Sequence, residues 1–393
     1  MSIAEKMAGF VASSSWIRKM FEEGARLKSI HGSDNVYDFS LGNPCIPPPP
    51  AFRRYLKSIV ENEAPGVHAY MPNTGYAHVR KSVAEFITRE QGAKITENDV
   101  IMTCGAAGGL NIILKAIVNP GDEIITPAPY FVEYGFYADN HGGQLVPVKT
   151  RSDFDIDIEA IERAIGEKTA AVLINSPNNP TGRVYPEKTL GALGDLLREK
   201  SRTIGRTIYL LSDEPYRKIT YDGIAVPSVF KYYSNSFIAT SHSKDLSIPG
   251  ERIGYVAVNP EADEKEMLLQ AMALANRILG FVNAPAIMQR VVGGLQGEHV
   301  DISEYARKRD ILCNGLADFG FRFVPPDGAF YLFPQSPVPD EIEFVKALQE
   351  ERILAVPGSG FGTPGYFRLS FCVEDRTITD ALPGFERAFK RFK

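Results

Sequence analysis

The stretch Ser-His-Ser-Lys-Asp-Leu-Ser-Ile-Pro-Gly-Glu-Arg-Ile-Gly-Tyr, residues 241–255, directly follows an apolar run that is typical of a buried strand. It places Lys244 beside a serine and eight positions before Arg252. A lysine amine becomes nucleophilic when burial or a nearby cation lowers its pKa, and cofactors with an aldehyde react with such an amine. Hydroxyls and a guanidinium suit a phosphate group. The pattern therefore predicts a catalytic Lys244, although a solvated strand end is the simpler alternative.

A second apolar run ends in acidic residues. In IYLLSDEPY, residues 208–216, the predicted strand leads into Asp213 and is followed by Tyr216. A carboxylate at the carboxyl end of a buried strand lies where open parallel sheets bind their ligands. Pyridoxal phosphate uses such a carboxylate to keep its ring nitrogen protonated. The segment therefore favours this cofactor, with Tyr216 as a donor to the phenolic oxygen of its ring.

Two further strand–turn units lie upstream. In AAVLINSPNNPTG, residues 170–182, Asn179 could donate an amide hydrogen to a cofactor or a carboxylate, or could belong to an ordinary Pro-Asn turn. In VIMTCGAAGGLNIILKAI, residues 100–117, a turn of small residues opens a predicted helix. Free amides at a helix start can bind a phosphate, and a tight turn without a ligand is the alternative.

In this order, the four segments resemble the fold-type I pyridoxal-phosphate enzymes, specifically the class I/II aminotransferases that are similar to aspartate aminotransferase. The motifs that carry the resemblance are an Asn-Pro-Thr-Gly turn, Asp-x-x-Tyr, Ser-x-Ser-Lys and Gly-x-Arg-x-Gly, and it extends from Gly42 to Arg368. It implies pyridoxal 5'-phosphate as cofactor. It also implies an α/β fold, with a large domain built on a mainly parallel seven-stranded sheet and a smaller α+β domain.

The resemblance also implies roles for single residues. Lys244 would form the Schiff base, Asp213 would bind the pyridine nitrogen, and Tyr216 would complete the catalytic group. The implied cofactor-binding residues are Gly105, Ala106, Ala107, Phe131, Asn179, Asp213, Tyr216, Ser241, Lys244, Arg252 and, from a neighbouring subunit, Tyr70. Phe131 would stack on the ring, with Tyr130 as the alternative if the register differs by one.

Three residues are expected at the substrate. The resemblance implies that Gly42, Asn179 and Arg368 bind the substrate carboxylate, because arginine can bind it with two parallel hydrogen bonds. The alternating segment YFRLSF, residues 366–371, also allows an Arg368 that faces solvent. Gly42 could equally be a plain turn glycine.

The implied reaction is ping-pong transfer of an amino group from an L-amino acid to a 2-oxo acid. Scaffolds that resemble this one also cleave C–S bonds or decarboxylate, so a lyase is the alternative. Ala107 stands where some aspartate-specific relatives carry lysine, which argues against aspartate specificity. Arg277 lies near a segment that reads acidic side chains in another branch, and we hypothesise that it does so here.

Composition limits the class of protein and its possible partners. The chain has 393 residues, 44% hydrophobic and 23% charged, with a net charge of −5, which is typical of a globular protein and gives no basic field for nucleic acid. No apolar run is long enough for a membrane span. The cysteines (Cys45, Cys104, Cys313 and Cys372) lie far apart without metal-ligand spacing, so we expect free thiols, no metal and a cytoplasmic location.

The length predicts two domains. Strands are expected near 100–104, 123–126, 170–175, 208–212, 236–240 and 253–258, in a large cofactor-binding domain of residues 46–285. The small domain should combine residues 1–45 with 286–393 and end in a helix at 376–391. Within the first segment, apolar residues recur at helical spacing: Trp16, Ile17, Met20, Phe21 and Leu27. A homodimer with shared active sites is expected from the resemblance.

Overall fold

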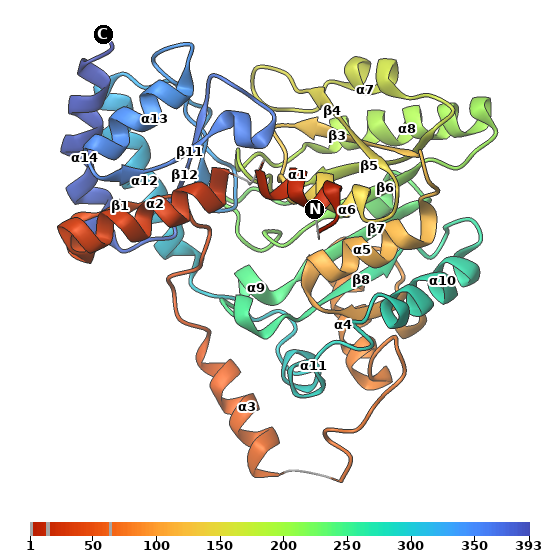
Figure 1. Ribbon diagram of the computed structural model, residues 1–393. Helices are drawn as coiled ribbons and strands as arrows, with labels where there is room; N and C mark the ends of the chain where they lie inside the picture. Colours follow the sequence, from red (N-terminus) through yellow and green to blue (C-terminus); the bar gives the residue numbers. More distant parts are fainter. Residues whose placement is uncertain (1–2, 13–15, 63–64) are drawn as a thin grey trace.

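A seven-stranded sheet forms the centre of the protein (Figure 1). The computed structural model describes residues 3–12, 16–62 and 65–393. The strands are β2 (Val100–Thr103), β3 (Glu123–Ala128), β4 (Gln144–Lys149), β5 (Thr169–Asn175), β6 (Tyr209–Asp213), β7 (Ser236–Ser241) and β8 (Gly254–Val258), in the spatial order β2-β8-β7-β6-β5-β3-β4. The predicted seven-stranded, mainly parallel sheet is therefore confirmed.

One strand of this sheet runs against the others. Strand β8 is antiparallel to both β2 and β7, whereas the pairs among β3 to β7 are parallel. Only the short helix α9 (His242–Asp245) and a 3-10 turn separate β7 from β8. This connection contains no helix long enough to cross a face of the sheet, and β8 returns in the opposite direction beside β7.

The sequence analysis found six of these strands and missed β4. Strand β4 lies at the edge of the sheet, is half-exposed along its length and contains Pro147. Prolines and polar residues are tolerated at sheet edges because one side of an edge strand makes no ladder hydrogen bonds. The continuous apolar run that identified the central strands is therefore lacking in β4.

Helices cover both faces of the sheet. Successive strand residues point to opposite faces, so Val172 belongs to one hydrophobic cluster and its neighbours Ala171 and Leu173 to another. The first cluster contains side chains of α4 (Ala77–Gln91), α7 (Ile158–Ala164), α8 (Glu187–Ile204) and α11 (Ala286–Gly293). The second contains those of α5 (Gly105–Ile117), α6 (Glu133–Asp139) and α10 (Lys265–Ile278). Helices on both faces of a mainly parallel sheet make this domain a doubly wound α/β structure.

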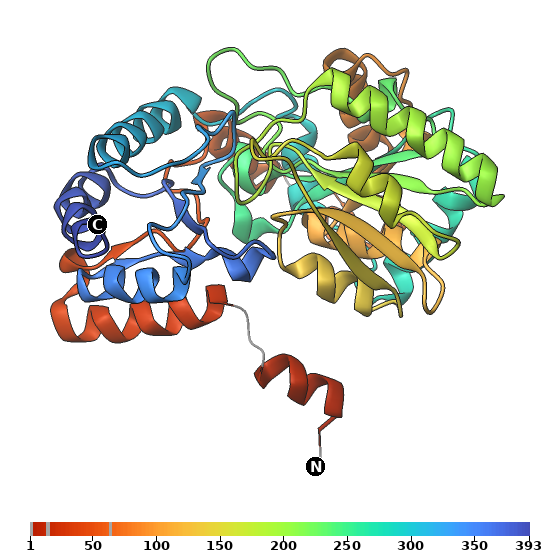
Figure 2. The ribbon, with the colours of Figure 1, turned by 90° about the horizontal axis from the view of Figure 1, so that it is seen from above.

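A separate hydrophobic core lies beside the sheet (Figure 2). Its antiparallel sheet has the order β11-β12-β9, and a parallel pair joins β1 to β10. The elements are α2 (Trp16–His31), β1 (Tyr37–Asp38), α12 (Ile302–Phe319), β9 (Tyr331–Leu332), α13 (Glu341–Glu350), β10 (Ile353–Leu354), β11 (Val356–Pro357), β12 (Phe367–Ser370) and α14 (Asp375–Lys390). Helix α14 confirms the predicted final helix to within one residue at each end.

The amino-terminal segment packs on this second core. In α2, Met20 and Leu27 are buried and Trp16 is half-buried, while the side chains of Ile17 and Phe21 lie outside the described part. The predicted division into residues 46–285 and the remainder stays a prediction. Helix α11 contributes Met288 and Val291 to the cluster of the large sheet, which favours a limit nearer residue 300.

Two elements lie at the periphery. Helix α1 (Glu5–Ala12) contacts α6, with the ring of Phe10 4.9 Å from that of Phe136, and α3 (Pro50–Glu61) extends away from the sheet (Figure 1). The four cysteines are unpaired. Within the described ranges, no helix is both long and apolar enough to cross a membrane.

Candidate functional site

A cavity of about 340 Å³ lies at the carboxyl ends of β5, β6 and β7, next to the second core. The sheet brings together strand ends that are far apart in sequence, and the second core adds residues from both ends of the chain. The predicted residues that line the cavity are Gly42, Ala106, Ala107, Phe131, Asn179, Asp213, Tyr216, Ser241, Lys244, Arg252 and Arg368. These residues surround a single space.

Asp213 is the buried acid of this cavity. It ends β6 and is 6% exposed. Its Oδ2 accepts a hydrogen bond of 2.6 Å from the Tyr134 hydroxyl, and its Oδ1 has no partner within the described part of the chain. Burial raises the pKa of Asp213 to about 7, with the Tyr134 hydrogen bond opposing the rise and Glu214 adding to it. Oδ1 is therefore a buried acceptor that a ligand can satisfy.

Lys244 is held on α9 with its amine inside the cavity. Its Nζ donates to the backbone oxygen of Gly42 over 2.7 Å. Burial lowers the pKa of Lys244 to about 8, and the positive charges of Arg368 and Arg252 act in the same direction while Cys372 opposes them. The shift brings deprotonation of the amine much closer to neutral pH than for an ordinary lysine, as expected for a nucleophilic lysine.

An anion site lies at the start of α5. The helix begins at Gly105, and Ala106 and Ala107 line the cavity together with Ser241 and Arg252. A β-carbon on Gly105 would lie 3.0 Å from Nη2 of Arg252, and Gly105 has a φ of +73°. The left-handed backbone favours glycine at position 105, and the missing side chain leaves room for Arg252 at the helix start, where the backbone amides and the helix dipole attract negative charge.

Arg368 is buried on β12 without an acidic partner among the described residues. Its Nη1 donates to Oδ1 of Asn179 over 3.1 Å, and its Nη2 donates to the backbone oxygen of Ser40 over 2.5 Å. Burial lowers the pKa of Arg368. A buried guanidinium without a counter-ion favours the binding of a carboxylate, because the negative charge of the carboxylate neutralises its positive charge. The alternative of a solvent-facing arginine is excluded.

The two candidates for the stacking residue point to different places. Phe131 lines the cavity, whereas Tyr130 packs against Gly362 and its backbone NH donates to Phe361 over 3.1 Å. The geometry thus favours Phe131. Tyr70 is 93% exposed and Arg277 lies on the exposed end of α10, so neither lines the cavity within one chain.

Sequence reasoning missed several residues that line or support the site, among them Tyr134, Tyr331 and Asn175. Tyr134 binds Asp213, Tyr331 lines the cavity, and Asn175 donates through Nδ2 to the backbone oxygen of Asp213 over 2.8 Å. Asn175 ends a predicted strand beside Asp213, and Tyr134 follows Phe131 at helical spacing, so both left a local signal. Tyr331 left none, because only the packing of the second core brings it here.

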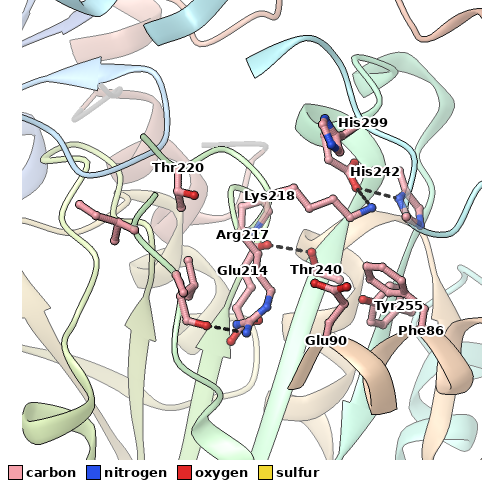
Figure 3. A pocket seen from close by; sticks show the side chains of 16 residues that line it. Phe86, Glu90, Glu214, Arg217, Lys218, Thr220, Thr240, His242, Tyr255 and His299 are labelled. Carbon is pink, nitrogen blue, oxygen red and sulfur yellow. Dashed lines mark hydrogen bonds and ion pairs between the residues drawn. The ribbon is translucent and has the colours of Figure 1, made fainter. Parts of the chain in front are cut away.

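A second cavity, of about 390 Å³, is lined by Lys218, His242 and Asp245 among others (Figure 3). Lys218 forms an ion pair of 3.0 Å with Asp245, which also lies 3.3 Å from Nδ1 of His242. Burial alone would raise the pKa of Asp245, but Lys218 and His242 outweigh it and hold that pKa well below its usual value. These contacts anchor α9 from behind, next to Lys244. No group of metal-ligating side chains occurs among the residues that the structure describes.

Comparison with known proteins identifies the family. The family described as aminotransferase class I and II matches residues 34–384. The chain belongs to this family. It is 34% identical to the aspartate/prephenate aminotransferase of Thermus thermophilus over 342 residues, which cover 84% of this chain and 85% of that protein. It is 32% identical to the aspartate aminotransferase of Bacillus subtilis, with 90% and 91% of the two chains covered.

Solved structures agree with this assignment. An amino transferase from Eubacterium rectale has a TM-score of 0.97 at 42% identity, with both chains fully covered. The aspartate aminotransferase of Thermus thermophilus with maleate has a TM-score of 0.86 at 28% identity, covering 99% of this chain and 100% of that one. The expected fold, family and enzyme class are confirmed: the chain is an aminotransferase rather than a lyase, and its cofactor is pyridoxal 5'-phosphate.

The residues of the cavity fit this cofactor. Asp213 offers a buried, unpartnered oxygen for a protonated ring nitrogen, and the start of α5 with Arg252 offers a site for a phosphate. The amine of Lys244 lines the same cavity. Each of the three groups of the cofactor that need a partner therefore finds one.

The first prediction concerns the cofactor-free protein. Because the pKa of Asp213 is raised to about 7 in the folded chain, this chain binds a proton more tightly than the unfolded chain does. Its free energy of unfolding should therefore fall as the pH rises through the window between about 4 and 7. We expect the free energy of unfolding of Asp213→Asn, measured with denaturant, to rise relative to that of the wild type as the pH increases. The difference between the two proteins should grow by about 2 kcal/mol from pH 5 to pH 8.

A second variant sharpens this test. Tyr134→Phe removes the hydrogen bond that lowers the pKa of Asp213, so its loss of stability should extend to higher pH than that of the wild type. A difference between Asp213→Asn and the wild type that does not change with pH would contradict the proposed burial of this carboxyl.

Proposed function

We propose that Lys244, Asp213 and Arg368 carry out transamination in this cavity. The observation that supports the proposal is that three ionisable side chains, the buried Asp213 and Arg368 and the half-buried Lys244, surround one space, and none forms an ion pair within the described residues. Burying an unpaired charge is costly, so such a cluster is found where ligands supply the missing charges. A cofactor with a cationic ring, an aldehyde and a phosphate, together with a substrate carboxylate, meets these needs.

The cofactor, when bound, supplies an electron-deficient ring that takes up the charge developing at the substrate Cα. Asp213 Oδ1 would hold the proton on the ring nitrogen. Tyr216 would donate to the ring oxygen, Phe131 would stack on the ring, and Ser241 would bind the phosphate with Arg252 and the α5 amides. Asn179 would donate its amide hydrogen either to the ring oxygen, beside Tyr216, or to the substrate carboxylate.

Arg368 would orient the substrate. With its guanidinium fixed by Asn179 and Ser40, it would bind the α-carboxylate and direct the Cα–H bond towards Lys244. The Lys244 amine would then accept the proton from the substrate Cα and would donate it to the cofactor at C4', its aldehyde carbon. A pKa of about 8 suits a group that must accept and donate a proton near neutral pH.

The cavity wall that remains for the substrate side chain is mostly apolar and aromatic. Besides the groups already assigned, Leu110, Tyr137 and Tyr331 line the cavity, and these give it an apolar and aromatic wall. Ala107 provides no cation. Arg277, the candidate for binding an acidic side chain, is exposed on α10 and does not line the cavity within one chain.

We propose that the active form is a homodimer in the cytoplasm. Tyr70 is almost fully exposed, and exposed apolar residues extend over α3 and α10, namely Tyr55, Val60, Met267, Leu274 and Ile278. Exposed apolar side chains on both helices support burial against a second copy. Tyr70 would then reach the phosphate of the neighbouring site. The four unpaired cysteines support a reducing compartment.

Replacing the lysine tests the central role. Lys244→Ala keeps the phosphate and ring contacts, so it should bind the cofactor without a covalent bond yet lose turnover by about three orders of magnitude or more. Lys231→Ala, which changes an exposed lysine, is the control for loss of a charge. Undiminished turnover of Lys244→Ala would remove this residue from the reaction.

Arg277→Ala tests the reading of acidic side chains. We expect the ratio of kcat/KM for aspartate and glutamate to that for an aromatic or aliphatic donor to fall by about tenfold, because a charge-assisted hydrogen bond is lost. If the preference of the variant equals that of the wild type, Arg277 does not contact the substrate.

Hybrid dimers test the shared site. Tyr70→Phe and Lys244→Ala each damage a different part of the site, so mixing the two inactive or weakened proteins should restore activity in the hybrid that carries one intact site. Subunit exchange is verified by mass spectrometry of differently labelled chains. No recovery after verified exchange would argue against a contribution of Tyr70 across the interface.

A further inference from the structure

Tyr331 lies between two residues that the proposed function assigns to different ligands. It belongs to β9, where Ser370 of β12 is its partner, and it is 2% exposed. Its ring centroid lies 4.7 Å from the guanidinium carbon of Arg368, and its hydroxyl lies 2.9 Å from that of Tyr216. A single side chain therefore contacts both the candidate carboxylate site and the candidate partner of the cofactor ring.

The ring of Tyr331 helps to hold the guanidinium. Arg368 lies between two aromatic faces, since the ring of Phe361 is 4.8 Å away. Aromatic faces attract a cation and compensate part of the hydration that Arg368 loses on burial. Its hydrogen bonds to Asn179 and Ser40 fix the guanidinium at its edge, so the rings and the edge contacts together define its plane. Bidentate binding of a carboxylate depends on that plane.

The hydroxyl of Tyr331 acts on the other neighbour. Burial raises the pKa of Tyr331 to about 12, and it raises the pKa of Tyr216 well above its ordinary value. Either hydroxyl can donate in this contact, and Tyr331 has the lower pKa of the two. When it donates to Tyr216, the hydrogen of Tyr216 remains free for another acceptor, and the two bonds form a chain in which each strengthens the other.

Tyr331 also explains why position 42 is a glycine. A β-carbon on Gly42 would lie 1.9 Å from the Tyr331 hydroxyl oxygen, which is far below contact distance. The backbone oxygen of Gly42 accepts the hydrogen bond from Lys244. The glycine therefore leaves the space that lets Tyr331 stand beside Lys244, Tyr216 and Arg368.

We propose that Tyr331 is a positioning residue that links the substrate-carboxylate site at Arg368 to the cofactor-ring site at Tyr216, its ring holding the guanidinium and its hydroxyl holding the tyrosine. The inference rests on the proposed function, because it takes Arg368 as the carboxylate site and Tyr216 as the donor to the ring oxygen. Its two halves make different predictions. Loss of the ring should affect the carboxylate, and loss of the hydroxyl should affect the cofactor.

Two substitutions separate these halves in the cofactor-loaded protein. Tyr331→Phe keeps the ring and should bind maleate, a dicarboxylate without an amino group, within about threefold of the wild type. It should raise the pH midpoint of the absorption band of the bound cofactor by about half a unit, because the ring oxygen loses part of its hydrogen bonding. Tyr331→Leu should weaken maleate binding by about tenfold or more.

Phe344→Leu is the matched control. Phe344 is fully buried in the same core, and its ring contacts Phe321, Phe367 and Phe392. This variant loses an aromatic ring away from the site, so both readouts should stay at the wild-type values. Circular dichroism and thermal unfolding check that each variant is folded.

The outcomes distinguish the two levels of the argument. Wild-type protein that shows no cofactor band, or a band but no binding of either maleate or a monocarboxylate with an apolar side chain, would contradict the proposed function and the role of Tyr331 with it. A normal wild type with an unshifted midpoint in Tyr331→Phe, or with undiminished maleate binding in Tyr331→Leu, would overturn the role of Tyr331 alone. A control that changes as much as Tyr331→Leu would show a merely structural effect and would also overturn it.

Discussion

The site depends on the burial of ionisable groups that have no counter-charge of their own. Asp213 retains one unpartnered oxygen, Lys244 donates to a backbone oxygen, and Arg368 is held by an amide, a carbonyl and two aromatic rings. Each arrangement satisfies part of the hydrogen bonding and leaves the charge uncompensated. Burying such groups costs several kcal/mol each in the absence of a partner. The rest of the protein supplies the packing energy that tolerates this cost.

The two hydrophobic cores have separate tasks in this arrangement. The large sheet aligns the carboxyl ends of β5, β6 and β7, which sets the positions of Asn179, Asp213 and Ser241. The second core brings Arg368 and Tyr331 to the same cavity on β12 and β9. The pairing of β1 with β10 ties the amino-terminal segment, which carries Ser40 and Gly42, to that core. The substrate side and the cofactor side of the cavity are thus built by different parts of the chain.

Sequence patterns within short segments predicted the structural features that depend on those segments alone. Continuous apolar runs identified the central strands, and the polar residues that follow them, such as Asp213 and Lys244, could be placed at the same edge of the sheet. Strand β4 escaped because an edge strand needs no continuous apolar run. Tyr331 escaped for a different reason, since its contacts with Tyr216 and Arg368 join segments that only the folded chain brings together. The need for glycine at position 42 likewise depends on that distant hydroxyl.

The most direct test of the account is a crystal structure of the protein loaded with pyridoxal phosphate and maleate. The account predicts continuous density from Nζ of Lys244 to the cofactor, the ring nitrogen at Oδ1 of Asp213, and a carboxylate at Arg368 that remains between Tyr331 and Phe361. A cofactor bound without contact to Asp213, or a dicarboxylate bound away from Arg368, would contradict the claim that ligands supply the charges which the fold leaves unpaired.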